Sequence, residues 1–293
     1  DGVANSNDQN ERQHIIHANT QGIMGGNLSG YFVITADDSE TTGGEDENTF
    51  YTIGARQQGK AGALDYRVEY YYQFCDGAVP GHDHDWRAGY TTVGDGVTID
   101  RKAHMLGLRV GKTFKNASWK PTITLWADSL TGTDDDDVAS QDMGAFNTLQ
   151  DTGHKFYGFM DNYLNGSGTG SNHMGLQDIA LKTKFKLSAT NTLKADFHHF
   201  QTQTSLDDGD SNTIRANAAS AGSVETGTRN GDLGQELDII LVHKYDSNTK
   251  IVGGYGHYFS SSAFSTLNGG GGTAGSNSND DQDWMFAMVD TKF

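Results

Sequence analysis

The chain has 293 residues and a net charge of −17, with 38 acidic residues against 21 Lys and Arg. This acidic balance excludes nucleic acid as a partner, because binding to a phosphate backbone depends on clustered cations. A single cysteine, Cys75, excludes an internal disulfide framework and a cysteine-based zinc cluster, and we expect it to be a free thiol in a loop.

Segments in which apolar and polar residues alternate recur along the whole chain, and no convincing amphipathic helix interrupts them. The clearest is ALDYRVEYYYQF, in which one side carries only apolar and aromatic residues while the other collects Asp65, Arg67 and Glu69. A helix would scatter those charges around its circumference, whereas a strand sorts them onto one face. In chain order, the predicted strands cover roughly 13–18, 28–36, 49–57, 63–74, 101–113, 119–129, 175–187, 191–200, 234–245, 249–260 and 284–293.

The connections between these eleven strands alternate in length. Short connections fall at 19–27, 58–62, 114–118, 188–190 and 246–248, and long ones at 37–48, 75–100, 130–174, 203–233 and 261–283. Outer-membrane barrels have short periplasmic turns and long external loops, and strands of about ten residues cross a bilayer when tilted. We therefore predict an all-β protein, a transmembrane antiparallel up-and-down β-barrel in the bacterial outer membrane. Its long loops would be extracellular and its wall would contact outer-membrane lipid and lipopolysaccharide.

The last predicted strand shows the expected sidedness. Met285, Ala287, Val289 and Phe293 share one face, which we assign to lipid, and Phe293 would lie in the aromatic girdle at the periplasmic interface. We expect residues 1–293 to form a single barrel domain. Because a closed bacterial barrel needs an even number of strands and residues 1–12 are too polar to add one, we expect this chain to be the C-terminal portion of the barrel. Missing N-terminal strands, or another chain, would complete the wall.

Charge is distributed unevenly between loops and strands. The five long connections hold 26 acidic residues and only four Lys or Arg, so that the rest of the chain carries a cationic excess. Arg or Lys facing lipid costs about 2–4 kcal/mol at the bilayer midplane, which assigns the strand cations to the inner face. The predicted lumen-lining, substrate-binding residues are Arg56, Arg67, Arg109, Lys182, Lys184, Lys186 and Lys194. In the alternative interpretation they pair across strands with Asp65, Glu69, Asp178, Asp196 and Glu236 and only solvate the pore.

No cofactor is predicted. Acidic clusters at 45–47, 134–137, 207–210 and 279–283 have the oxygen ligands that Ca²⁺ prefers, although a solvated surface explains them equally. His82 and His84 in GHDHD suggest a transition-metal site without an identifiable third ligand. The chain contains no G-x-S-x-G, H-E-x-x-H or P-loop motif, so no enzyme is predicted.

Several stretches resemble the alginate export family of outer-membrane β-barrels. The resemblance rests on five segments in order: DTGHKFYGFMDNYL (151–164), GLQDIALKTKFKLSATNTLKADFHHF (175–200), GQELDIILVHKY (234–245), GGYGHYFSSSAF (253–264) and DWMFAMVDTKF (283–293). It implies a monomeric barrel of roughly eighteen strands, within the range of known bacterial barrels. It also implies a lumen that passively conducts an anionic polysaccharide or smaller polar solutes.

Two other function classes stay open from the sequence. One is a secreted or surface-exposed β-rich adhesion or structural module whose acidic loops bind Ca²⁺. The other is a structural barrel that anchors a partner. The first does not explain why one face is apolar in every predicted strand, including Tyr66, Val68, Tyr70 and Tyr72.

Overall fold

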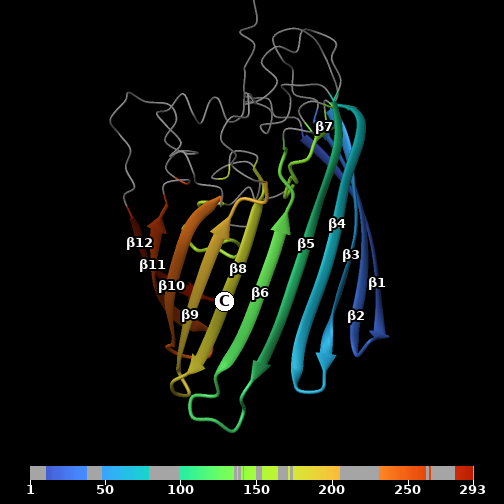
Figure 1. Ribbon diagram of the computed structural model, residues 1–293. Coiled ribbons are helices and arrows are strands. Elements are labelled where there is room, and N and C mark those ends of the chain that lie inside the picture. The colour runs from blue at the N-terminus through green and yellow to red at the C-terminus, as the bar shows by residue number, and fades with distance from the viewer. Residues whose placement is uncertain are drawn as a thin grey trace, which may run out of the picture.

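The computed structural model consists of one large curved antiparallel sheet (Figure 1). It describes residues 11–37, 48–78, 99–134, 142–149, 154–163, 174–204, 231–261 and 281–292, together with residues 137, 140, 171 and 264. No helix among these residues is long and apolar enough to cross a membrane. The strands, all in one sheet, confirm the predicted all-β architecture.

Eleven long strands follow one another across the sheet, and each pairs with its neighbours in the chain. They are β1 (Glu11–Ile23), β2 (Gly26–Asp37), β3 (Asn48–Ala61), β4 (Leu64–Ala78), β5 (Ile99–Thr113), β6 (Thr122–Leu130), β8 (Leu176–Lys186), β9 (Asn191–Gln201), β10 (Asp232–Lys244), β11 (Thr249–Ser260) and β12 (Gln282–Thr291). A two-residue strand, β7 (Asp142–Met143), pairs with β5 in parallel beside this path. Within the described residues β1 and β12 have one neighbour each, so they are the edges of the sheet.

The eleven predicted strands correspond one to one with the long strands, but several predicted bounds are too narrow. The segment predicted at 13–18 belongs to β1, which continues to Ile23. Near its end, β1 is polar (Asn19, Thr20 and Gln21), so the alternation of apolar and polar residues is lost there. The backbone pairing with β2 nevertheless continues. Backbone pairing, rather than hydrophobic burial, extends the strand there.

Short turns join the strands at the lower end of the sheet in Figure 1, as the alternation of connection lengths predicts. Local side-chain bonds fix two of these turns. Asp246 accepts hydrogen bonds from the backbone N–H of Asn248 and Thr249, both at 2.7 Å, and Ser188 accepts one from the N–H of Asn191 at 2.9 Å. These bonds lower the pKa of the Asp246 carboxyl, because they favour its charged form. Asp and Ser are favoured in turns for this reason.

The sheet has one apolar and one polar face. Large apolar side chains stand exposed on the outer face of every long strand, including Leu125 at 60%, Ile179 at 57% and Met285 at 74% of their surface. The residues between them point to the inner face, where charged side chains gather. A soluble protein does not leave so extensive an apolar surface in water, whereas a wall that faces lipid requires it.

Two glycines on the inner face lie directly under aromatic rings of the neighbouring strand. Gly54 on β3 pairs with Tyr71 on β4, and Gly254 on β11 pairs with Phe286 on β12. A Cβ at either glycine would collide with the ring opposite it. Only glycine leaves room for both rings to lie flat against the wall.

Cys75 does not lie in a loop, so that prediction is wrong. It is in β4, 5% exposed, and packs with Phe50, Met143 and Ala145 on the inner face. The alternation of β4 continues beyond Phe74, which places Cys75 on the same face as Gln73.

We expect a maleimide to label Cys75 at close to the background rate in the folded protein and rapidly after unfolding, because reaction requires an accessible thiolate. Mass spectrometry of timed samples measures both rates. Rapid labelling of the folded protein would contradict the burial of this side chain.

Candidate functional site: the inner face and its inward segment

Four charged residues of alternating sign cross the inner face from β4 to β6, and we name them the Glu69 ladder. Arg67 and Arg109 both contact Glu69, at 2.5 and 3.0 Å, and Arg109 also contacts Asp128 at 3.1 Å. The register explains this arrangement, because Arg67 pairs directly with Arg109 and Glu69 and Asp128 both flank Gly107. Glu69, Arg109 and Asp128 are all buried, so each charge depends on its neighbours for compensation.

The ladder is buried because a piece of the long connection between β6 and β8 folds onto it. We name residues 154–163 the inward segment. Within it, Phe156 lies 5.5 Å from the Arg109 guanidinium, and Tyr157 is 7% exposed. The Trp126 ring also contacts that guanidinium, at 3.9 Å, and lies 6.1 Å from the Phe156 ring. Burial raises the pKa of Tyr157 well above its usual value, with smaller contributions from Asp128 and Asp178, so its hydroxyl stays protonated.

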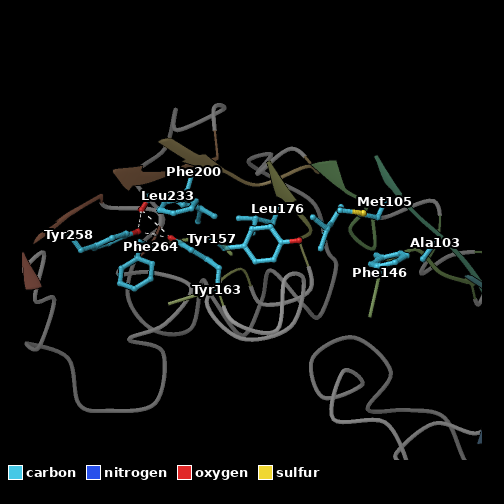
Figure 2. Close-up of a cluster of buried hydrophobic side chains, with 11 residues drawn as sticks. Ala103, Met105, Phe146, Tyr157, Tyr163, Leu176, Phe200, Leu233, Tyr258 and Phe264 are labelled. Atoms are coloured by element: carbon cyan, nitrogen blue, oxygen red, sulfur yellow. Dashed lines mark hydrogen bonds between the residues drawn. The ribbon is translucent and has the colours of Figure 1, made fainter. Parts of the chain in front are cut away.

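The end of the inward segment joins the hydrophobic cluster at the upper rim of the sheet, part of which is drawn in Figure 2. Tyr163 is fully buried, and its hydroxyl lies 2.5 Å from that of Tyr258 on β11. Its ring packs against Phe200 on β9 and Phe264. The segment is thus also attached to the wall at β9 and β11.

Glu236 on β10 fixes the middle of the inward segment. Its carboxylate Oε1 accepts hydrogen bonds from the backbone N–H of Phe159 at 2.5 Å and of Met160 at 2.8 Å. The side chain of Glu236 is completely buried. Gly158 has a φ of +90°, and a Cβ at that position would collide with the Glu236 carboxylate. The glycine therefore allows the backbone to approach the carboxylate closely.

Aromatic contacts attach the same segment to β12. The His154 ring stacks on Trp284 with centroids 4.8 Å apart, and Phe159 stacks on Phe286 at 5.8 Å. His154 also bonds the carbonyl of Phe159 at 2.7 Å through Nδ1, which closes the segment on itself. The inward segment consequently touches the inner face from β5 to β12.

A second buried pair lies next to Glu236 on the inner face. His198 and Asp178 are in contact at 2.9 Å and are 0% and 1% exposed. His198 is directly opposite Glu236 in the ladder between β9 and β10, and its Nε2 has no hydrogen-bond partner among the described residues. His199, the next residue, points to the outer face, as alternation requires.

All seven predicted lumen residues lie on the inner face. Three of them are paired: Arg67 and Arg109 with Glu69, and Lys182 with Asp196 at 3.4 Å. Arg56 lies over the Tyr31 ring at 5.6 Å. No ion pair is present within the described residues for the remaining three, Lys184, Lys186 and Lys194. Lys184 and Lys194 are directly opposite each other in the ladder between β8 and β9.

The alternative of cross-strand pairing is therefore correct in part. Glu69 and Asp196 pair with cations of the predicted set, as that interpretation requires. Asp178 binds His198 instead, Glu236 binds the inward segment, and Asp65 pairs with Lys60 at 2.7 Å.

Sequence reasoning missed the inward segment as a structural element. Its own sequence, HKFYGFMDNY, has no strand or helix period, and its partner Glu236 is 76 residues away from Met160. The usable signal was the density of aromatic residues around one glycine in an otherwise polar connection. That pattern indicates packing against a wall rather than a solvated loop.

The proposed metal sites stay predictions. His82 and His84, the clusters at 45–47 and 207–210, residues 135, 136, 279 and 280 of the other two clusters, and Phe293 lie outside the described residues. No group of three or more His, Cys, Asp or Glu within the described residues is arranged to hold a metal ion.

Comparisons with known proteins identify the family. No curated protein is significantly similar in sequence to this chain. Among solved structures, the NanC porin in a rhombohedral crystal form is similar to it at 8% identity and a TM-score of 0.38, over 97% of this chain and 95% of that chain. The family model described as alginate export matches residues 3–272, which covers nearly all of the sheet. The chain therefore belongs to the alginate export family, and it is an outer-membrane β-barrel channel of that type.

Proposed function

We propose that this protein passively conducts anionic solutes through a lumen lined by the inner face of the sheet. The observation that carries the proposal is the sidedness of the wall, with apolar rows outside and the cationic set inside. The connections at the upper end of the sheet are then extracellular and the short turns periplasmic, as in other barrels of this kind. No catalytic step is part of the proposal.

Anion preference would come chiefly from the cations that have no carboxylate partner in the part of the chain that the structure describes. Lys184, Lys186 and Lys194 lie together on β8 and β9, and Lys184 and Lys194 repel each other across the ladder. A passing anion relieves that repulsion. Arg67, Arg109 and Lys182 contribute less to the field because each is neutralised by an adjacent carboxylate.

The inward segment favours small solutes over an extended polymer in the present conformation. It lies on the inner face from β5 to β12 and is held by hydrogen bonds at Glu236 and by aromatic contacts at both ends. An anionic polysaccharide would require its displacement. We therefore propose small organic anions as the solutes that pass while the segment is in place.

Replacing Lys184, Lys186 and Lys194 together with Gln is expected to lower the anion-to-cation permeability ratio by about twofold. At a distance of about 8 Å in water, each lysine charge attracts a passing anion by about 0.5 kcal/mol before screening. Screening at physiological salt reduces the sum of the three attractions to roughly the energy of a twofold effect. Reversal potentials across planar bilayers under a salt gradient measure the ratio.

Lys182→Gln combined with Asp196→Asn serves as the matched control, because it removes a charge together with its partner and should leave the ratio nearly unchanged. An unchanged reversal potential in the triple variant would refute the role of these lysines. A purified protein that reconstitutes fully but does not conduct would refute the channel and favour a barrel that anchors a partner.

A further inference from the structure

A cavity of about 380 Å³ lies on the inner face between β1–β5 and the covering residues 146–149, 156 and 157. Five aromatic side chains form much of its wall: Tyr31, Tyr71, Phe146, Phe156 and Tyr157. Its volume is in the range of sites for small organic molecules, which are mostly apolar with a few convergent polar groups. The channel proposal assigns no role to this cavity.

Four polar side chains that line the cavity have a buried atom without a hydrogen-bond partner within the described residues: Thr52, Arg67, Glu69 and Arg109. Thr52 lines it, is 2% exposed, and its Oγ1 has no hydrogen-bond partner within the described residues. Arg67 also lines it, and its Nε is likewise buried without a hydrogen-bond acceptor there. Buried polar atoms of proteins are almost always bonded, so the unbonded donors of Thr52 and Arg67 indicate an acceptor that the described residues do not supply.

The charge around the cavity favours an anion. Arg67, Glu69 and Arg109 line it, and Asp128 contacts Arg109 behind them. These four charges cancel. Arg56, whose guanidinium lies over the Tyr31 ring at 5.6 Å, adds one positive charge that no carboxylate among the described residues balances.

The lining selects a flat apolar ring in preference to a sugar. A pyranose would bring several hydroxyl groups into a space whose walls are mainly aromatic and aliphatic, and each unpaired hydroxyl would cost free energy. An aromatic ring instead stacks on the tyrosine and phenylalanine faces at little cost. A single carboxylate would meet the free donors of Thr52 and Arg67.

We infer that this cavity is a binding subsite for an aromatic monocarboxylate, held by ring stacking and by Arg67 and Thr52. The inference rests on the proposed function, because the ligand reaches the subsite from the lumen. It adds an identified class of solute to a channel whose preference was defined above only by charge and size.

Calorimetric titration of the detergent-solubilised full chain with benzoate tests the inference. Benzoate is expected to bind, whereas benzyl alcohol and glucuronate, which lack the charge and the aromatic ring respectively, should bind at least tenfold more weakly. Arg67→Met is expected to lower the affinity for benzoate by about tenfold to a hundredfold, which corresponds to the loss of a charge-assisted hydrogen bond. Thr52→Val, which keeps the shape of the side chain, should weaken it by about threefold to tenfold.

Lys60→Met on the same face, 73% exposed at its side chain and away from the cavity, is the matched control and should leave the affinity unchanged. Heat-modifiable gel mobility verifies that each variant is folded. The subsite is refuted if benzoate does not bind, or if the Thr52 and Arg67 variants bind benzoate as tightly as the unsubstituted protein does. Conductance of the same preparation is measured separately: a conducting protein without benzoate binding refutes only the subsite, and a binding protein without conductance refutes only the channel.

Discussion

Replacing Glu236 with Ala is expected to detach the inward segment from the wall, raise single-channel conductance and make the chain cleavable by trypsin after Lys155. The variant removes the acceptor for two buried N–H groups, those of Phe159 and Met160. Leaving a buried donor unsatisfied costs about 1–3 kcal/mol, so the two together cost roughly 3 kcal/mol. That cost increases the population of the detached state by about a hundredfold.

The backbone of the segment strengthens this expectation. His154, Tyr157 and Asp161 all have positive φ values, of 58°, 56° and 58°. Non-glycine residues in this region carry a conformational cost of about 1 kcal/mol or more each, which only the surrounding contacts offset. A segment that loses its bonds to Glu236 keeps only the local bonds of His154 to Phe159 and Asp161 to offset this cost.

Two further variants separate release of the segment from general misfolding. Glu236→Gln keeps an acceptor oxygen and should show a much smaller increase in conductance. Gly158→Ala leaves Glu236 intact but places a methyl group against its carboxylate, so it should reproduce the alanine phenotype. Planar-bilayer recordings and timed trypsin digestion in detergent provide the two measurements. Unaltered conductance and digestion in both Glu236→Ala and Gly158→Ala would show that Glu236 does not hold the segment.

Replacing Leu125 with Lys is expected to lower the free energy of unfolding in lipid vesicles by about 2–4 kcal/mol, the cost of a cation facing the centre of a bilayer. Leu125 lies on the outer face of β6 and is 60% exposed in the isolated chain. The same substitution at Thr124, the preceding residue on the inner face, should cost at most about 1 kcal/mol. That smaller cost comes from repulsion by Lys182, which is directly opposite.

Urea titration of vesicle-inserted protein, followed by tryptophan fluorescence and by gel mobility, measures both variants. The comparison is sensitive to sidedness because the two positions share a strand and differ only in the face they present. Equal destabilisation by both lysines, or a greater effect at Thr124, would mean that the outer rows do not contact hydrocarbon.

The sidedness of the wall was predictable because strand geometry maps odd and even positions onto opposite faces. Arg67 and Val68, or Lys182 and Leu181, lie on the faces that alternation assigns to them, and the outer rows of all eleven strands follow the same rule. Alternation alone therefore predicted that a strand cation lies on the inner face, without any knowledge of the residues around it.

What those cations contact was not predictable to the same degree. Arg109 has Glu69 and Asp128 as partners because β4, β5 and β6 pair in one particular register, and register depends on backbone pairing along entire strands. The role of Glu236 depends on a connection that returns to the wall from the distant rim. Alternation says nothing about such a return, because it describes only the strands.

The glycines beneath Tyr71 and Phe286 have a consequence for the bore of the conduit. A ring lying flat adds only about 3.5–4 Å of thickness to the wall, one layer of van der Waals contact. An alanine at Gly54 or Gly254 would displace that ring from its place against the wall. In the proposed channel, two residues without a side chain would therefore decide how far these aromatic groups project from the wall.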